Sequence, residues 1–234
     1  MLRIDAVRAG YGRTEVLHGV SLVVEPGEMV AVLGRNGVGK TTLLKATIGA
    51  VTISSGRVAL HDRDLTRTRA HDRARAGVAY VPQGRDIFPR LSVLDNLRVA
   101  AYGTRQRGWS RALDRLLDEF PVLREKAAQP GGSLSGGQQQ ILALARALMT
   151  GPRVLLLDEP SEGIQPSIVD QIAETIRRIN AERGISVVLV EQNLDFAARI
   201  AGHAYLMAKG EIVHALPAND MLGDRGLQHE YLGV

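Results

Sequence analysis

The chain has 234 residues, a length that suits one domain, or one domain that carries a subdomain. Hydrophobic residues make up 45% and charged residues 23%, which excludes disordered, collagen-like and coiled-coil proteins. The absence of cysteine excludes disulfide bonds, thiolate metal sites and a cysteine nucleophile. The net charge of +4 is a mild, scattered excess, so we expect no nucleic-acid partner. No apolar run approaches the ~18 residues of a membrane span.

Short apolar runs, each followed by a glycine, a proline or an acidic residue, indicate buried strands. They cover residues 29–33, 77–81, 154–157 and 185–190. Strands that are apolar on both faces are typical of a parallel sheet covered by helices. Helical patterns alternate with these runs, and one of them places Ile168, Ile172, Ile176 and Ile179 on a single helix face. The alternation predicts an α/β fold with a parallel-sheet core.

Further short strands border this core. They are expected over residues 16–24 and 57–60, and in a hairpin of residues 204–208 and 211–215 that turns at Lys209-Gly210. The stretch of about 85–151 is mostly helical, and the chain then returns to a core strand at Val154. We therefore expect an inserted helical subdomain over about 85–151, a core formed by about 1–84 and 152–234, and one domain spanning 1–234.

A glycine-rich segment follows the first core strand. Residues 34–41 read Gly-Arg-Asn-Gly-Val-Gly-Lys-Thr and match G-x-x-x-x-G-K-[ST] between a strand and a helix. Glycines let backbone N–H groups converge on phosphate oxygens. Lys40 is predicted to reach the β- and γ-phosphates of a nucleotide, and the Thr41 hydroxyl to bind Mg²⁺. The full set of predicted nucleotide contacts in this segment is Gly34, Asn36, Gly37, Gly39, Lys40, Thr41 and Thr42. The competing interpretation is an ordinary glycine-rich turn.

The strand at 154–157 leads into a pair of acids. Asp158 is predicted to hold Mg²⁺, directly or through water, and Glu159 to accept a proton from the attacking water. The alternative is an Asp-Glu pair that only begins a loop.

Residues 134–138, here called the signature segment, read Leu-Ser-Gly-Gly-Gln and open a helix that runs to Met149. Ser135 and Gln138 have the spacing of a capping box, so a capped helix is one interpretation. The other is an anion site made of free N–H groups, a hydroxyl and the helix dipole. Because the chain already has a complete phosphate loop, such a site is expected to serve a nucleotide bound mainly by another subunit.

Together, residues 34–41, Gln83, 134–138 and 154–159 resemble the ATP-binding subunit of ABC transporters, over nearly the whole chain. The resemblance implies a P-loop cassette fold with an antiparallel β subdomain and an inserted helical subdomain. It also implies a head-to-tail pair of ATPase subunits that encloses two ATP molecules. Tyr11 is expected to stack on adenine, and Gln83 to touch Mg²⁺ and the attacking water. Contacts to the γ-phosphate of the facing subunit's ATP are expected from Ser135, Gly136, Gly137 and Gln138.

A finer resemblance rests on residues 83–89 and 162–167, and it is to the ATPases of branched-chain amino acid and urea importers. The second string is most similar to the urea type, so urea is the predicted solute. Branched-chain amino acids or short-chain amides are the alternative. These importers pair two ATPases, usually non-identical, with two membrane permease subunits and a periplasmic solute-binding protein. The chain is accordingly expected to lie peripherally at the cytoplasmic face of the inner membrane.

Two positions depart from the family pattern. Gln192 stands where most members have histidine, and we expect it to contact the γ-phosphate as a neutral amide that carries no proton. Ile164 stands where an aspartate is usual, and Ser161 or Glu162 is expected to take that role. We therefore predict Glu159, Gln83 and Gln192 as the catalytic residues, and Thr41, Gln83 and Asp158 as the Mg²⁺ ligands.

Two rival functions and one surface remain open at this level. The rivals are an ABC ATPase that acts on ribosomes or DNA repair, and a scaffold that binds ATP without hydrolysis. The surface is the loop with Ile87, Phe88 and Leu91, flanked by prolines. It either docks a short cytoplasmic helix of the membrane subunit or seals the helical subdomain.

Overall fold

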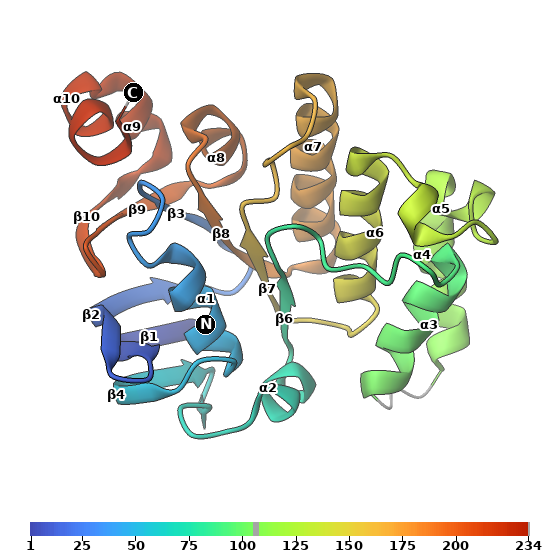
Figure 1. Ribbon diagram of the computed structural model, residues 1–234, viewed down its shortest axis with the longest axis horizontal. Coiled ribbons are helices and arrows are strands. Elements are labelled where there is room, and N and C mark those ends of the chain that lie inside the picture. Colours follow the sequence, from blue (N-terminus) through green and yellow to red (C-terminus); the bar gives the residue numbers. More distant parts are fainter. Residues whose placement is uncertain (105–107, 234) are drawn as a thin grey trace.

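The apolar runs form a sheet that is buried on both faces. This computed structural model describes residues 1–104 and 108–233. In this part of the chain the strand order of the sheet is β10-β9-β3-β8-β7-β6 (Figure 1). Its strands are β3 (Met29–Leu33), β6 (Val78–Val81), β7 (Val154–Asp158), β8 (Ser186–Glu191), β9 (His203–Ala208) and β10 (Glu211–Pro217). All neighbouring strands pair in parallel except β10, which forms an antiparallel hairpin with β9.

Successive side chains of each core strand enter different apolar clusters. In β3, Val30 and Val32 belong to one cluster and Ala31 and Leu33 to the other. Strands β7 and β8 divide their side chains in the same way. Because neighbouring residues of a strand point to opposite faces, a sheet covered on both sides needs apolar residues at every position.

A second, antiparallel sheet covers one face of the core. Its order is β2-β1-β4-β5, and its strands are β1 (Leu2–Tyr11), β2 (Thr14–Val24), β4 (Ile53–Leu60) and β5 (Arg63–Asp64). Helix α1 (Lys40–Ile48) packs into the same apolar cluster as this sheet and as Val30, through Leu43 and Leu44. The helix that follows the phosphate loop is thus held in the apolar cluster that joins the two sheets.

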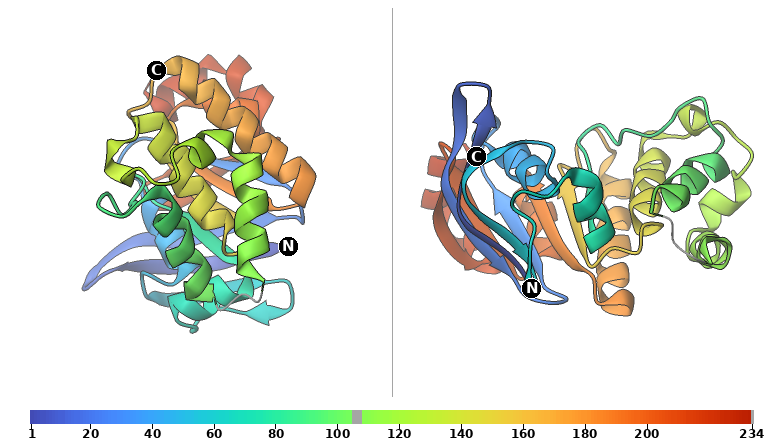
Figure 2. Two further views of the ribbon diagram at one scale, coloured as in Figure 1. Left: turned by 90° about the vertical axis from the view of Figure 1, so that its right-hand side faces the viewer. Right: turned by 90° about the horizontal axis from the view of Figure 1, so that it is seen from below.

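Helices cover the other face of the core and extend beyond it. They are α3 (Val93–Thr104), α4 (Trp109–Glu119), α5 (Pro121–Glu125), α6 (Gly136–Leu148), α7 (Pro166–Arg183) and α8 (Leu194–Ile200). Figure 2 shows that α3, α4 and α5 project to one side of the sheets. The remaining helices are α2 (Ala70–Ala76), α9 (Ala218–Gly223) and α10 (Arg225–Leu227), with a 3₁₀ turn at Gly131–Ser133 and a π-helical turn at Gln228–Leu232. Within residues 1–104 and 108–233, no helix combines the length and apolar character that crossing a bilayer requires.

The predicted fold class is confirmed: a parallel core is bordered by an antiparallel sheet, and helices fill most of the stretch between β6 and β7. The strand bounds differ from the expected ones by a few residues, and β4 begins at Ile53 rather than at Arg57. Strand β1 was not predicted at all. The helical subdomain over about 85–151 stays a prediction, since α6 packs on β6 as well as on α3.

Candidate nucleotide-binding site

The phosphate loop lies at the carboxyl end of β3, the strand that β8 and β9 flank on either side. Gly39 precedes α1 with a φ of 112°, a left-handed conformation that side chains rarely adopt. A Cβ atom at Gly39 would also lie 3.0 Å from the Met207 side chain. Glycine therefore lets the loop turn directly into α1, where the first N–H groups of the helix have no partner within the helix.

Lys40 is held inside the loop by three oxygen atoms. Its side chain is 4% exposed, and Nζ donates hydrogen bonds to the carbonyl oxygens of Gly34 at 2.7 Å and Arg35 at 3.1 Å. Nζ also lies 3.2 Å from Glu159 Oε1. An ammonium group has three donors, so these partners match its full capacity. The predicted phosphate-binding lysine and the predicted base thus form an ion pair.

Asp158 ends β7 and is 1% exposed. Its Oδ1 accepts a hydrogen bond from Thr41 Oγ1 at 2.9 Å, and its Oδ2 accepts one from the Tyr80 hydroxyl at 2.7 Å. Burial and the bond to Asp158 raise the pKa of Tyr80, so the hydroxyl stays protonated and donates. The Thr41 hydroxyl, the Asp158 carboxylate and the Gln83 amide oxygen are the hard oxygen donors that Mg²⁺ prefers. Their chemistry fits the predicted cation.

Glu159 and Gln83 lie next to each other. Glu159 adopts a φ of 46°, a strained conformation for a residue with a side chain, and its N–H donates to Val190 O at 2.9 Å. Gln83 Nε2 donates to Glu162 Oε2 at 2.7 Å and lies 3.4 Å from Glu159 Oε2. The turn directs the Glu159 side chain toward Lys40 on one oxygen and toward Gln83 on the other.

A cavity of about 460 Å³ is lined by much of the predicted set. Its lining residues are Val16, Asn36, Gly37, Gly39, Lys40, Thr41, Thr42, Gln83 and Glu159. Val16 was not predicted, because an apolar strand residue carries no chemical signal of its own.

Several predicted residues do not line this cavity. Tyr11, 51% exposed, lies at the end of β1, and Gln192 is exposed just after β8. Among the described residues that line the cavity, none belongs to the signature segment. The site therefore falls into a part assembled within the chain and a part that faces outward.

The signature segment caps its own helix. The Gln138 N–H donates to Ser135 Oγ at 3.4 Å, and the Ser135 N–H donates to Gln138 Oε1 at 3.1 Å, so the predicted capping box is present. A Cβ atom at Gly137 would lie 2.2 Å from the Ile168 side chain, so glycine here permits close packing of α6 on α7. Ser135 itself is exposed.

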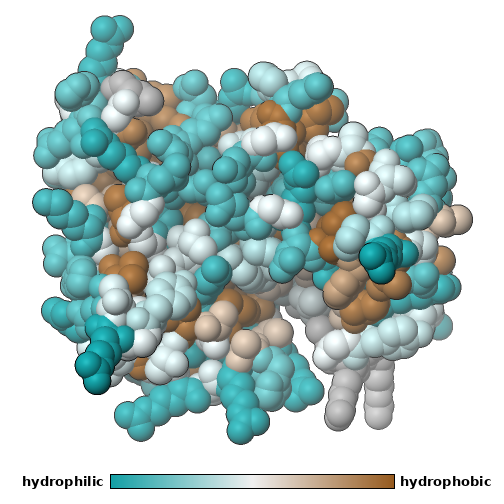
Figure 3. Space-filling view, in the orientation of Figure 1, coloured by the Kyte–Doolittle hydropathy of each residue, from teal (hydrophilic) through white to brown (hydrophobic). Residues whose placement is uncertain are grey.

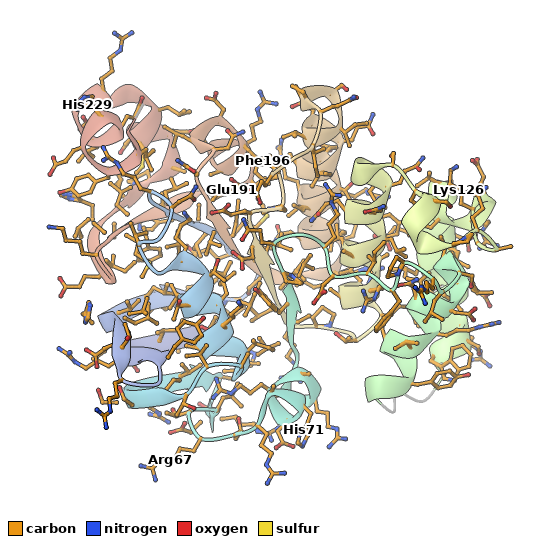
Figure 4. All side chains as sticks on the ribbon, viewed as in Figure 1. Arg67, His71, Lys126, Glu191, Phe196 and His229 are labelled. Carbon is orange, nitrogen blue, oxygen red and sulfur yellow. The ribbon has the colours of Figure 1, made fainter. Side chains whose placement is uncertain are left out.

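Glu191 joins the loops that follow β7 and β8, a role that the sequence did not suggest. It is 2% exposed, and Figure 4 labels it at the end of β8. Its Oε1 accepts bonds from the Ser161 N–H and hydroxyl at 3.0 and 2.6 Å. Its Oε2 accepts from the N–H groups of Gln192 and Asn193 at 3.0 and 3.1 Å. Burial raises the pKa of Glu191, against the opposing effect of these hydrogen bonds.

A family model described as ABC transporter matches residues 17–162. The chain belongs to this family. The high-affinity branched-chain amino acid transport ATP-binding protein BraG of Pseudomonas aeruginosa is 40% identical over 233 residues, which cover 100% of both chains. The probable branched-chain amino acid transport protein LivF of Archaeoglobus fulgidus is 36% identical over 234 residues, 100% of this chain and 99% of its own.

The fold also matches that of a solved ABC transporter cassette. A solved structure titled as the ADP conformation of MJ1267, an ATP-binding cassette of an ABC transporter, aligns with a TM-score of 0.86 at 25% identity, over 100% of this chain and 99% of that one. The chain is an ATP-hydrolysing ABC cassette that energises a transporter. Both rival functions, the non-transport ATPase and the scaffold without hydrolysis, are thereby set aside.

Proposed function

We propose that this ABC ATPase powers the uptake of branched-chain amino acids. The observation that supports the solute class is the full-length similarity at 40% identity to BraG, a branched-chain amino acid transport protein. The urea prediction rested on residues 162–167 alone and finds no support among the relatives described above. The alternative prediction, a branched-chain amino acid importer of the same group, is better supported.

The proposed reaction is in-line attack of water on the γ-phosphorus of ATP, which breaks the bond to the bridging β,γ-oxygen and releases ADP and phosphate. The loop amides and Lys40 hold the phosphates and offset the negative charge that spreads over them in the transition state. Thr41, Asp158 and Gln83 would hold Mg²⁺, which would offset negative charge on the phosphates. Glu159 accepts the proton of the attacking water. The observation that supports this assignment is the 3.2 Å contact between Lys40 Nζ and Glu159 Oε1, which brings the two charged groups side by side.

The same ion pair suggests how substrate readies the base. Lys40 has one ammonium donor toward Glu159 and two toward loop carbonyls. A phosphate oxygen that takes the place of the carboxylate leaves Glu159 without its cation and next to Gln83. In this scheme the base becomes available only when the phosphates are in place.

The outward-facing residues are assigned to subunit contacts. We assign Ser135, Gly136, Gly137 and Gln138 to the γ-phosphate of a second ATPase subunit, packed head to tail, and Tyr11 to the adenine of this chain's own ATP. Gln192 completes the catalytic set as a neutral γ-phosphate contact. Since the signature segment lies outside the cavity of its own chain, it is free to serve another.

We propose that a second cavity binds a membrane permease subunit. A groove of about 720 Å³ lies between α1, α2, α6 and the edge strand β6. The loop of Ile87, Phe88 and Leu91 adjoins it, because the Phe88 ring lies 4.5 Å from the guanidinium of Arg146, which lines the groove. Phe88 and Leu91 are 40% and 38% exposed, and Figure 3 shows apolar side chains gathered over this loop. We assign the groove to a cytoplasmic helix of a permease subunit, which places the chain peripherally at the cytoplasmic face of the membrane.

Reconstitution tests the proposal. The chain is assembled in liposomes with its ATPase partner and permease subunits, and the uptake of labelled leucine and of labelled urea is measured with the periplasmic binding protein present. We expect ATP-dependent uptake of leucine. Uptake of urea without leucine would contradict the solute class while leaving the ATPase assignment in place.

A further inference from the structure

Tyr80 connects the edge of the core sheet to the carboxylate at its carboxyl end. It lies in β6 and pairs in parallel register with Leu156 of β7, two residues before Asp158. Its hydroxyl reaches along the neighbouring strand and donates to Asp158 Oδ2 at 2.7 Å. Three residues further on, Gln83 contacts Glu159 and Glu162. One short segment thus reaches both of the acids that end β7.

The bond from Tyr80 completes the contacts of a buried carboxylate. Thr41 donates to Oδ1 and Tyr80 to Oδ2, so each oxygen of Asp158 has a donor. The terminal torsion of an aspartate is broad, and donors on both oxygens restrict it to one plane. Loss of the Tyr80 hydroxyl would leave Oδ2 without this partner at a site only 1% exposed. The carboxylate would then be free to rotate away from Thr41.

The ring of Tyr80 is itself held in place. It packs against the apolar cluster that contains Leu43 and Leu44 of α1. Its outer side lines the groove together with Lys45, Ala143 and Arg146. Any occupant of the groove therefore meets the residue whose hydroxyl holds Asp158.

We propose that Tyr80 is a positioning residue for Asp158: its hydroxyl fixes Oδ2 so that Oδ1 stays directed toward Thr41 and the cation that these two residues share. The proposal rests on the proposed function, because it takes Thr41 and Asp158 as the Mg²⁺ ligands. Tyr80 acts through Asp158 and touches neither nucleotide nor water in this scheme.

The test compares Tyr80→Phe with Tyr205→Phe in the full chain. Tyr205 is the matched control, because its hydroxyl donates to Val23 O at 3.0 Å, at a place that does not line the phosphate cavity. The affinity for Mn²⁺, used in place of Mg²⁺, is measured by electron paramagnetic resonance in the presence of a non-hydrolysable ATP analogue. The affinity for the same analogue is also measured in EDTA, by fluorescence.

We expect Tyr80→Phe to weaken Mn²⁺ binding by about 10-fold, as befits the loss of one hydrogen bond to a charged group. Binding of the analogue in EDTA should be unchanged, and Tyr205→Phe should match wild type in both measurements. Wild-type Mn²⁺ affinity in Tyr80→Phe, or an equal loss of affinity in EDTA, would overturn the proposal. A wild-type chain that binds the analogue but no Mn²⁺ would overturn the cation site as well.

A second replacement separates hydrogen bonding from shape and remains informative if the Phe variant unfolds. Para-aminophenylalanine at position 80, introduced by stop-codon suppression, keeps the ring and a donor at its tip. We expect it to bind Mn²⁺ within about 3-fold of wild type, a difference smaller than one hydrogen bond. A loss as large as that expected for Tyr80→Phe would overturn the positioning role.

Discussion

The phosphate loop and the signature segment are both glycine-rich turns into a helix, yet they differ in what surrounds them. Lys40 is buried and contacts the loop and Glu159. Thr41, in α1, contacts Asp158 at the end of β7. Ser135 is exposed, and both its N–H and its hydroxyl form hydrogen bonds with Gln138 in the first turn of its own helix. The first turn is completed by its own chain, whereas the second presents its helix N-terminus outward. We therefore propose that a second chain closes the site, which its own chain completes on one side.

The largest effect is expected inside the self-contained half. Glu159→Gln keeps the shape of the side chain and removes the proton acceptor, so steady-state ATP turnover in the assembled transporter should fall roughly 10²–10⁴-fold. Nucleotide affinity should be retained, because the variant loses the Glu159 carboxylate that a phosphate oxygen displaces from Lys40 in the proposed scheme. Glu174→Gln serves as the matched control, since it makes the same change at an exposed acid of α7 that does not line the cavity. Unchanged turnover in Glu159→Gln would contradict the base assignment.

Gln192 tests the border between the two halves. Its side chain is exposed and does not line the cavity of its own chain, so the γ-phosphate contact that we propose requires the site to close. Gln192→Ala should lower turnover by about 10- to 1000-fold, through loss of one preorganised donor. Because an amide does not titrate, a pH–rate series should give parallel profiles for wild type and Ala. Equal rates at every pH would remove Gln192 from the catalytic set.

Phe88 tests the outward surface next to the groove. Phe88→Ser removes an exposed ring that lies over Arg146 and should reduce co-purification with the permease subunits by about 10-fold, given the apolar area removed from an interface. The ATP affinity of the isolated chain should not change. If ATP binding falls while assembly persists, the loop serves to seal the helices rather than to dock a partner.

Glu191 tests the link between the loops after β7 and β8, where we expect the smallest effect. Its carboxyl pKa is raised from 4.5 by burial, so the folded chain binds the proton more tightly than the unfolded chain. The stability that this contributes is present below pH 4.5 and is lost as the pH rises through the folded-state pKa. We therefore expect the free energy of unfolding in urea to fall for wild type, relative to Glu191→Gln, as the pH rises from 4.5 through the folded-state pKa. A difference that is constant with pH would contradict the shift.

The sequence predicted the core strands because each is apolar at every position and ends at a turn or an acid. It did not reveal β1, although Leu2, Ile4, Val7 and Ala9 are all buried. The reason is an irregularity between Ile4 and Val7, where Ala6 takes a φ of 45° and the alternation shifts by one residue. A strand interrupted in this way gives no regular period of two.

The sequence also predicted the motif residues of the site. Lys40 and Thr41 stand at fixed positions of the glycine-rich motif, and Asp158 directly follows an apolar strand. Tyr80 and Glu191 have no such spacing, and each finds its partner on a neighbouring strand or loop. One signal was present for Tyr80, since a tyrosine in an otherwise apolar buried strand must place its hydroxyl against an acceptor. The identity of that acceptor follows only from the register of β6 and β7.

The most direct test of the two-chain site follows which subunit loses its nucleotide. Ser135→Arg is introduced into this chain, the complete transporter is assembled, and 8-azido-ATP is trapped with vanadate and cross-linked to each ATPase subunit. The bulky cation blocks the signature segment and leaves Lys40 and Asp158 of the same chain untouched. We expect labelling of the partner ATPase to fall while labelling of this chain persists. Loss of labelling on this chain, with the partner unaffected, would contradict the head-to-tail arrangement.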